Sequence, residues 1–342
     1  MDVKNAFLHG FITEDIYMEQ PPGMKDPNYP NHVCKLQRAL YGLKQAPRAW
    51  FNRLSTFLLD YGFFCSLADP SLFVMHTSTG ILVLLIYVDD MLLTGSSMAL
   101  VQNFLQVLSS EFSMKDLGPL HHFLGIQVQT TDSGLHLNQT RYAHSILERA
   151  QMVDCQPMPT PLVQRMDVTS DTTPLGDPTH FRGLVGSLQY LTLTRPDLSY
   201  SVNYVSQFMH NPTMSHLKYV RRILRYLKGT IHYGLSFTAD TSLALSAFSD
   251  ADWAGCPTTR RSTTGYCTFL GANIISWCAK KQHTVARSST EAEYRSMAHT
   301  AAELTWLGYL LDDLRVYPTK PPILYGDNLS ALHLTVNPVF HT

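Results

Sequence analysis

Two adjacent carboxylates, Asp89 and Asp90, follow an unbroken apolar run from Ile81 to Val88. A short run of this kind is typical of a buried strand, and the apolar residues Met91 to Leu93 predict a second strand after the acids. The acids therefore lie at the turn of a predicted hairpin. Two carboxylates this close raise each other's pKa unless a cation neutralises them, and Mg²⁺ prefers oxygen ligands. Paired metals of this kind catalyse phosphoryl transfer, although most Asp-Asp pairs form only a solvated turn.

A second group of informative residues is basic and lies between Ser215 and Gly229. Five cations and no acid occur here, and the cations lie on the faces that an apolar stripe leaves uncovered. The cations are Lys218, Arg221, Arg222, Arg225 and Lys228, and the stripe is Leu217, Val220, Ile223, Leu224 and Leu227. The spacing predicts an amphipathic helix. Such a helix suits a nucleic-acid phosphate backbone, whereas a solvated helix face is the commoner explanation of a charge run.

The acidic hairpin belongs to a segment, residues 1–137, that mixes strand-like runs with amphipathic helices at Ala49–Tyr61 and Met98–Phe112. The Pro-, Thr- and Asp-rich stretch Gln156–Pro178 is interpreted as a mobile linker. Further helices are predicted at Tyr142–Ala150, His180–Thr194, Leu198–His210 and Ser215–Lys228.

From Leu243 onward the pattern changes to three strands, a long helix, a fourth strand and a terminal helix. The strands are predicted at Leu243–Ser249, Thr264–Leu270, Ile274–Ala279 and Ile323–Tyr325, and the long helix at Ser288–Leu314. Strands and helices in this order predict a mixed sheet covered by a helix.

Composition limits the class of protein without deciding it. The chain has 342 residues, of which 45% are hydrophobic, enough for two or three cores. It lacks an apolar run of about 18 residues or more and a recognisable secretory signal, which predicts no membrane partner. Its six cysteines are scattered, as is typical of reduced thiols. We therefore expect an intracellular protein, cytoplasmic or nuclear, and the sequence does not predict its oligomeric state.

Tyr87-Val88-Asp89-Asp90 resembles the metal-binding hairpin of reverse transcriptases. Three other motifs are similar to those of one branch, the copia-type retrotransposon polyprotein, and follow its order and spacing. Asp2–Gly10 resembles the first aspartate motif, Leu40–Trp50 the nucleotide and template motif, and Phe123–Ile126 the primer-contacting hairpin. With the C-terminal third included, the resemblance covers nearly the whole chain.

The resemblance implies an α/β (α+β) architecture. A reverse-transcriptase palm would occupy residues 1–137, a helical thumb and connection residues 138–240, and a ribonuclease H-like mixed-sheet domain residues 241–342. The implied function is that of an RNA-directed DNA polymerase with an attached ribonuclease H. Its partners would be an RNA template, a DNA primer, an RNA–DNA hybrid and dNTPs.

The resemblance also implies roles for the residues of the polymerase. Asp2, Asp89 and Asp90 would form the catalytic centre, where two Mg²⁺ bind and Mn²⁺ can substitute, with Asp2 and Asp89 as the direct ligands. Phe7 would crowd a ribose 2′-hydroxyl and so favour deoxynucleotides. The other implied contacts are Gly42, Lys44, Gln45, Pro47 and Arg48 with nucleotide or template, Leu124 and Gly125 with primer, and the five cations of the basic helix with the nucleic-acid backbone.

For the ribonuclease H centre the resemblance implies Asp250 at the first strand, Glu291 at the start of the long helix and Asp327 after the fourth strand. Two Mg²⁺ held there would activate water for attack on a phosphodiester. Asp252 is set aside because it lies two residues beyond Asp250, in a predicted turn. Glu293 is set aside because it lies about 200° around the helix from Glu291. The hybrid-binding rim would comprise Arg260, Arg261, Lys280, Lys281, His283 and Arg287.

Two features differ from the family pattern. The fingers region expected before Asp2 is absent, so the strand carrying Asp2 is expected to fray, and a fourth ribonuclease H carboxylate expected after Thr342 is also absent. We therefore expect a fragment truncated at both ends that performs no processive DNA synthesis alone. The alternatives are a non-catalytic retroelement relic that at most binds nucleic acid, and a stand-alone two-metal nuclease.

Overall fold

The computed structural model describes residues 1–163, 171–256 and 258–337, and these form two compact units. The first unit comprises Met1–Leu120 with Tyr309–Arg315, and the second runs from His121 to Gly308 and resumes at Val316. Both mix helices with sheets, which agrees with the expected α+β class. The N-terminal segment of the first unit ends at Leu120, so residues 121–137, which the sequence prediction included in the palm, lie in the second unit.

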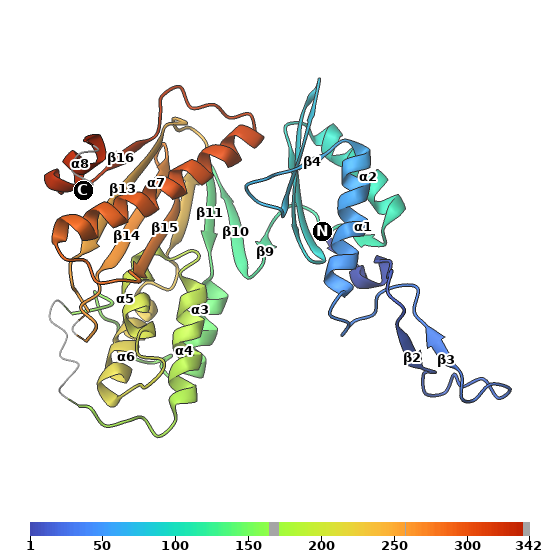
Figure 1. Cartoon of the computed structure of the whole chain (residues 1–342), viewed down its shortest axis with the longest axis horizontal. Coiled ribbons are helices and arrows are strands. Elements are labelled where there is room, and N and C mark those ends of the chain that lie inside the picture. Colours follow the sequence, from blue (N-terminus) through green and yellow to red (C-terminus); the bar gives the residue numbers. More distant parts are fainter. Residues whose placement is uncertain (164–170, 257, 338–342) are drawn as a thin grey trace. The chain divides into compact units, whose positions relative to one another are not determined.

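The first unit contains a six-stranded antiparallel sheet in the order β4-β5-β6-β7-β1-β8 (Figure 1). Its helices α1 and α2 pack against this sheet through Trp50, Leu54, Leu58, Phe104 and Leu108. Strand β6 contributes Leu82, Leu84 and Ile86, alternate residues that point to the same core. The elements are β1 Asp2–Val3, the 3₁₀ helix η1 Ala6–His9, β2 Tyr17–Glu19, β3 Val33–Lys35, α1 Ala46–Tyr61, β4 Phe64–Cys65, β5 Leu72–Thr77, β6 Gly80–Tyr87, β7 Asp90–Gly95, α2 Met98–Glu111 and β8 Met114–Lys115.

The second unit contains two four-stranded sheets and a helical block. One sheet has the order β12-β11-β10-β9, and this pairing explains why residues 122–138 belong to the second unit. Four helices, α3 to α6, share a continuous apolar core. The elements are β9 His122–Phe123, β10 Ile126–Thr131, β11 Gly134–Asn138, α3 Thr140–Arg149, α4 Pro178–Leu191, α5 Pro196–Ser206, α6 Met214–Gly229 and β12 Gly234–Thr238.

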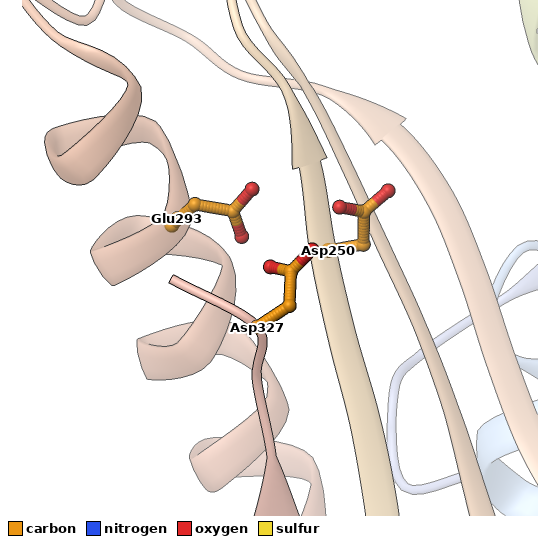
Figure 2. Close-up of side chains that lie close together, drawn as sticks. All are labelled: Asp250, Glu293 and Asp327. Carbon is orange, nitrogen blue, oxygen red and sulfur yellow. The ribbon is translucent and has the colours of Figure 1, made fainter. Parts of the chain in front are cut away.

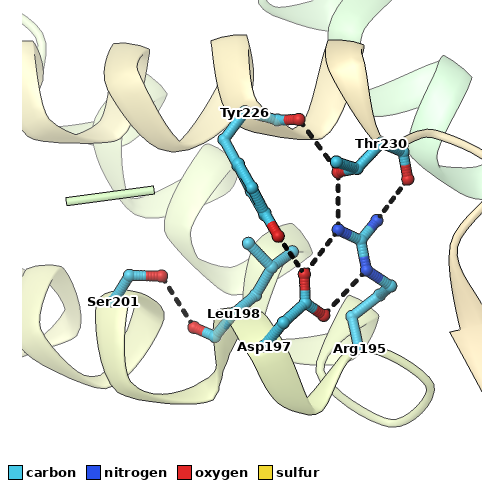
Figure 3. A network of polar contacts seen from close by, with 6 residues as sticks. All are labelled: Arg195, Asp197, Leu198, Ser201, Tyr226 and Thr230. Carbon is cyan, nitrogen blue, oxygen red and sulfur yellow. Dashed lines mark hydrogen bonds and ion pairs between the residues drawn. The ribbon is translucent and has the colours of Figure 1, made fainter. Parts of the chain in front are cut away.

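A buried arginine connects two of these helices (Figure 3). Arg195, 1% exposed, forms a two-pronged ion pair with Asp197 and donates to the carbonyl and hydroxyl of Thr230, just past the end of α6. Tyr226 of α6 donates to the same Asp197 carboxylate. This network joins the start of α5 to the end of α6.

The remaining sheet has the order β15-β14-β13-β16, with β13 and β16 parallel and the other pairs antiparallel. Helix α7 packs across one face of it, where Ser296 donates to the Asp250 carbonyl (Figure 1). The elements are β13 Leu245–Asp252, β14 Thr263–Leu270, β15 Asn273–Lys281, α7 Ser289–Asp313, β16 Ile323–Tyr325 and α8 Leu329–Val336. The predicted strands and long helix are therefore confirmed to within a few residues.

Part of the expected linker, residues 164–170, lies outside the described residues. The start of the predicted linker is bound to helix α6. Arg225 of α6 donates to the Gln156 carbonyl, and the Met158 amide donates to the Arg225 carbonyl. No helix in the described part of the chain is long and apolar enough to cross a membrane. All six cysteines are free thiols.

Candidate metal centres and nucleic-acid contacts

Three carboxylates from distant parts of the sequence lie together at one end of the β13–β16 sheet (Figure 2). Asp250 belongs to β13, Glu293 to the start of α7 and Asp327 follows β16, and one oxygen from each lies within 4.8 Å of the others. Asp250 and Asp327 are exposed, whereas Glu293 is only 7% exposed. Among the described residues, these form the one group of three or more His, Cys, Asp or Glu side chains with that spacing.

The parallel pairing of β13 with β16 brings two of these acids together. Phe248 is paired with Tyr325, and Asp250 and Asp327 each lie two residues farther along. Because parallel strands end at the same edge of a sheet, both carboxylates reach the same position. The third comes from α7, where Glu293 accepts a 3.2 Å hydrogen bond from the Ala251 amide. Three carboxylates without nitrogen or sulfur form a donor set suited to a hard divalent cation.

The structure places a different glutamate of α7 beside Asp250 and Asp327 from the one that the resemblance implied. Glu293, which was set aside, joins Asp250 and Asp327, while Glu291 lies elsewhere. Glu291 accepts a 2.7 Å hydrogen bond from the Arg287 amide and a 2.6 Å one from Arg295. The buried stripe of α7 contains Glu293, Ser296, Met297 and Thr300. The i, i+3, i+4, i+7 spacing of these buried residues places Glu293 on the sheet side of the helix.

The two glutamates have opposite electrostatic environments. Burial, together with the nearby charges of Asp250 and Asp327, raises the pKa of Glu293 from 4.5 to about 6. The Arg287 amide and the Arg295 guanidinium lower the pKa of Glu291. A cation bound among the three acids would offset the repulsion that Glu293 experiences. Asp252 lies outside the cluster, as expected, and its carboxylate accepts from the Thr263 amide.

The acids expected at the polymerase centre lie on strand β1 and on the neighbouring β6–β7 hairpin, whose backbones are paired. Asp2 of β1 is paired directly with Asp90 of β7, and the Val3 amide donates to the Asp89 carbonyl at 3.0 Å. Asp89 lies in the turn between β6 and β7. Within the described residues, these three carboxylates do not form a cluster of the kind found around Glu293. The structure therefore brings their strands together without bringing their oxygens to a common point.

The expected fraying of the first strand is wrong. Strand β1 lies between β7 and β8, and Asp2 is paired on both sides, with Asp90 and with Lys115. The Met1 ammonium group donates to the Met91 carbonyl, and the Met91 amide donates back to Met1. These contacts hold Asp2 beside the hairpin.

The residues expected to contact nucleotide or template surround the start of α1. Phe7 of η1 packs against Tyr41 with ring centroids 4.7 Å apart. Gly42 has φ +94°, a conformation that L side chains rarely adopt, and open space surrounds its missing side chain. Gln45 is the N-cap of α1, Pro47 lies in its first turn, and Lys44 and Arg48 are exposed. An exposed positive edge is thus present at this loop.

Two aromatic residues that sequence reasoning missed contact the turns of the predicted hairpins. The Trp50 indole N–H donates to the Val88 carbonyl at 2.6 Å, next to Asp89. The Tyr190 hydroxyl donates to the carbonyl of Leu124, which with Gly125 forms the turn between β9 and β10. Both contacts join residues far apart in the sequence, so no local pattern could have indicated them.

The basic helix α6 is only partly available to a ligand. Lys218 lies 3.7 Å from the Asp171 carboxylate, Arg222 donates to the Thr160 hydroxyl, and Arg225 is held by Gln156. Of the five cations only Lys218 faces an acid among the residues that the structure describes, whereas Arg222 and Arg225 keep their charges and bond to neutral oxygens. Arg221 is exposed and Lys228 partly so, and neither has a side-chain hydrogen bond or ion pair with the described residues.

Comparison with known proteins identifies the family. The family described as reverse transcriptase (RNA-dependent DNA polymerase) matches residues 1–164. The retrovirus-related Pol polyprotein from transposon RE1 of Arabidopsis thaliana is 51% identical over 344 residues, which cover 100% of this chain and 23% of the relative. The corresponding polyprotein from transposon TNT 1-94 of Nicotiana tabacum is 38% identical over 352 residues, covering 100% of this chain and 26% of the relative. A protein ascribed to transposon Ty5-1 of Saccharomyces cerevisiae is 34% identical over 308 residues, covering 89% of this chain and 100% of the relative.

The chain belongs to the copia-type retrotransposon polyprotein family. It spans about a quarter of the length of the long Pol polyproteins that it matches. The resemblance inferred from the motifs around Asp2, Asp89 and Gly125 is thereby confirmed at the level of the family. The reverse-transcriptase match lies in the half of the chain that carries the acidic hairpin.

Proposed function

We propose that this copia-type chain is the part of a retroelement RNA-directed DNA polymerase that carries an attached ribonuclease H centre. The observation that supports this most is the convergence of Asp250, Glu293 and Asp327 within 4.8 Å. A parallel strand pair and a crossing helix deliver these acids to one edge of a mixed sheet. Partners of the expected kind are an RNA–DNA hybrid, an RNA template with a DNA primer, and dNTPs.

In the proposed nuclease centre the three carboxylates hold divalent cations, two Mg²⁺ or Mn²⁺ in their place. Such ions supply Lewis acidity and a water of lowered pKa. Asp250 and Asp327, both exposed, face the substrate side, while buried Glu293 is fixed by the Ala251 amide. The fold holds the three mutually repelling carboxylates close together. Ser296 of α7 contributes by donating a hydrogen bond to the Asp250 carbonyl, which fixes the helix against the strand.

The proposed polymerase centre uses Asp2, Asp89 and Asp90. Its support is the backbone pairing of β1 with the hairpin, which keeps Asp2 opposite Asp90 and binds Val3 to Asp89. Divalent cations held there would supply charge stabilisation for transfer of a nucleotide to a primer. Phe7, Gly42 and the exposed cations Lys44 and Arg48 are the proposed contacts with nucleotide and template.

Cleavage of an RNA–DNA hybrid tests the nuclease proposal and the choice of acid together. In Mn²⁺ we expect the purified chain to cleave the RNA strand, and Asp250→Asn and Glu293→Gln to lose at least about 100-fold in rate, since each removes a charge that holds the metal. Glu291→Gln is the matched control, because it changes the same residue type two positions away, and it should retain activity to within about threefold.

Loss of cleavage in Glu291→Gln with retention in Glu293→Gln would contradict the geometric assignment. Absence of cleavage by the wild-type chain, together with measurable hybrid binding, would instead favour the non-catalytic relic. If the wild-type chain does not cleave, its thermal stability with and without Mn²⁺ shows whether the acids still bind metal, because metal binding to the folded chain raises that stability.

A further inference from the structure

The turns of the two predicted functional hairpins share an unfavourable backbone conformation. In the β6–β7 turn Val88 has φ +59°, and in the β9–β10 turn Leu124 has φ +47° and Gly125 φ +77°. Positive φ at the first central residue is normally supplied by Gly, Asn or Asp in two-residue hairpins. A bulky or β-branched residue there is a rare exception that persists only when its surroundings hold it.

Each of these turns is held by one aromatic side chain that donates a hydrogen bond. Trp50 of α1 donates its indole N–H to the Val88 carbonyl at 2.6 Å, and Tyr190 of α4 donates its hydroxyl to the Leu124 carbonyl. In both cases the acceptor is the carbonyl of the residue with the left-handed conformation. The two contacts lie in different units of the molecule, so they are independent instances of one arrangement.

Both donors are themselves fixed by their neighbours. Trp50 is 2% exposed and packs edge-on against Phe112 with centroids 5.3 Å apart. Tyr190 packs edge-on against Tyr142 at 5.0 Å. An aromatic side chain has few rotatable bonds, so its single donor atom is held at a fixed position relative to the helix and fixes the turn carbonyl that it contacts.

We propose that Trp50 and Tyr190 are positioning residues that set the conformation of the Asp89 turn and of the Leu124–Gly125 turn. The inference rests on the proposed function in one respect: the turns matter for catalysis because one carries a carboxylate of the polymerase centre and the other contacts the primer. Gly125 has φ +77°, which favours glycine, and a Cβ there would lie 2.6 Å from the Tyr190 hydroxyl oxygen.

Tyr190→Phe is the decisive variant, because it removes the donor and leaves the ring and its packing in place. Residue-resolved hydrogen exchange should show the amide of Ile126, which is paired with Phe123, about fivefold less protected, the factor expected for one ordinary hydrogen bond. Tyr233→Phe is the matched control: Tyr233 is 59% exposed in the same unit, and its loss of a hydroxyl should leave this turn unchanged. Unchanged protection in Tyr190→Phe would overturn the inference.

The corresponding variant Trp50→Phe should increase exchange at Asp90 and leave Ile126 unaffected. Because Trp50 is a core residue, this variant can fail to fold, and a second measurement covers that case: in the wild-type chain the Trp50 indole proton must exchange slowly. A rapidly exchanging indole proton would overturn the inference for the acidic turn.

Binding of a fluorescent DNA primer annealed to RNA template provides the functional part of the test. Tyr190→Phe should raise the dissociation constant about fivefold, while cleavage of a hybrid in the Asp250 centre changes less than twofold. A weakened turn with unchanged primer–template affinity would overturn the positioning role. Failure of the wild-type chain to bind primer–template would overturn the proposed function itself. The exchange measurements do not depend on primer–template binding, so they test the Tyr190 hydrogen bond separately.

Discussion

Glu291 and Glu293 lie two residues apart on α7, yet their surroundings shift their pKa values in opposite directions. Glu293 is buried among Asp250 and Asp327, and its pKa rises from 4.5 to about 6. Glu291 faces Arg295 and a backbone amide, and its pKa falls. At the residue scale the difference arises from the side of the helix on which each carboxylate lies.

This contrast predicts opposite effects of two conservative substitutions on stability in metal-free buffer. A raised pKa in the folded protein means that protonated Glu293 adds stability, which is fully present below pH 4.5 and lost as the pH rises through about 6. Glu293→Gln cannot ionise, so at pH 8 it should exceed the wild type in unfolding free energy by roughly 2 kcal/mol, and by almost nothing below pH 4.5. Urea denaturation in EDTA at pH 4.5 and 8 measures this.

Glu291→Gln is the control for that measurement and should show the reverse sign. The lowered pKa of Glu291 stabilises the fold above pH 4.5, and this contribution disappears as the pH falls through the lowered value. The variant should therefore be less stable than the wild type at pH 8. A pH-independent difference between Glu293→Gln and the wild type would contradict the assignment of Glu293 to a repulsive cluster.

At the scale of elements, much of the architecture could be predicted because each element has its own periodicity. Strand β16 lies at Ile323–Tyr325 as predicted, and β6 shows the alternating burial of Leu82, Leu84 and Ile86. Asp250 and Asp327, which the family resemblance implied, both lie in the acidic cluster. The rotational phase of α7 was misjudged because the prediction relied on motif position, and the buried face of α7 carries polar residues such as Ser296 and Thr300 that give no apolar signal. Trp50 and Tyr190 were missed because their partners depend on tertiary packing.

Helix α6 provides a prediction that separates charge from structure. Arg221→Ala and Lys228→Ala should weaken binding of a nucleic-acid duplex and reduce the dependence of log K on log salt by about 0.9 for each phosphate that is no longer neutralised. Arg222→Ala and Arg225→Ala should mainly destabilise the fold, because these residues hold Thr160 and Gln156. Fluorescence anisotropy over a salt series, paired with urea denaturation, makes the comparison. A salt dependence in Arg221→Ala and Lys228→Ala that equals that of the wild type would show that these two side chains do not contact phosphate.

At the scale of the whole molecule, the two proposed centres lie in separate compact units. Asp2, Asp89 and Asp90 belong to the unit that begins at Met1, whereas Asp250, Glu293 and Asp327 belong to the unit that begins at His121. Each unit has its own apolar core, around Trp50 and Leu54 in one and around Leu188 and Ile223 in the other. Substitutions that share no partners usually have additive effects.

The two centres should therefore be separable by single substitutions in the intact chain. Asp89→Asn should leave Mn²⁺-dependent hybrid cleavage within about twofold of the wild type, because no residue of the acidic hairpin takes part in the Asp250 cluster. Asp250→Asn should abolish cleavage and leave primer–template affinity unchanged. The measurement uses one hybrid substrate for both variants, with template-directed dNTP incorporation assayed in parallel. If Asp89→Asn removed cleavage as completely as Asp250→Asn, the acidic hairpin would have to support the nuclease centre, and the assignment of two independent sites would be wrong.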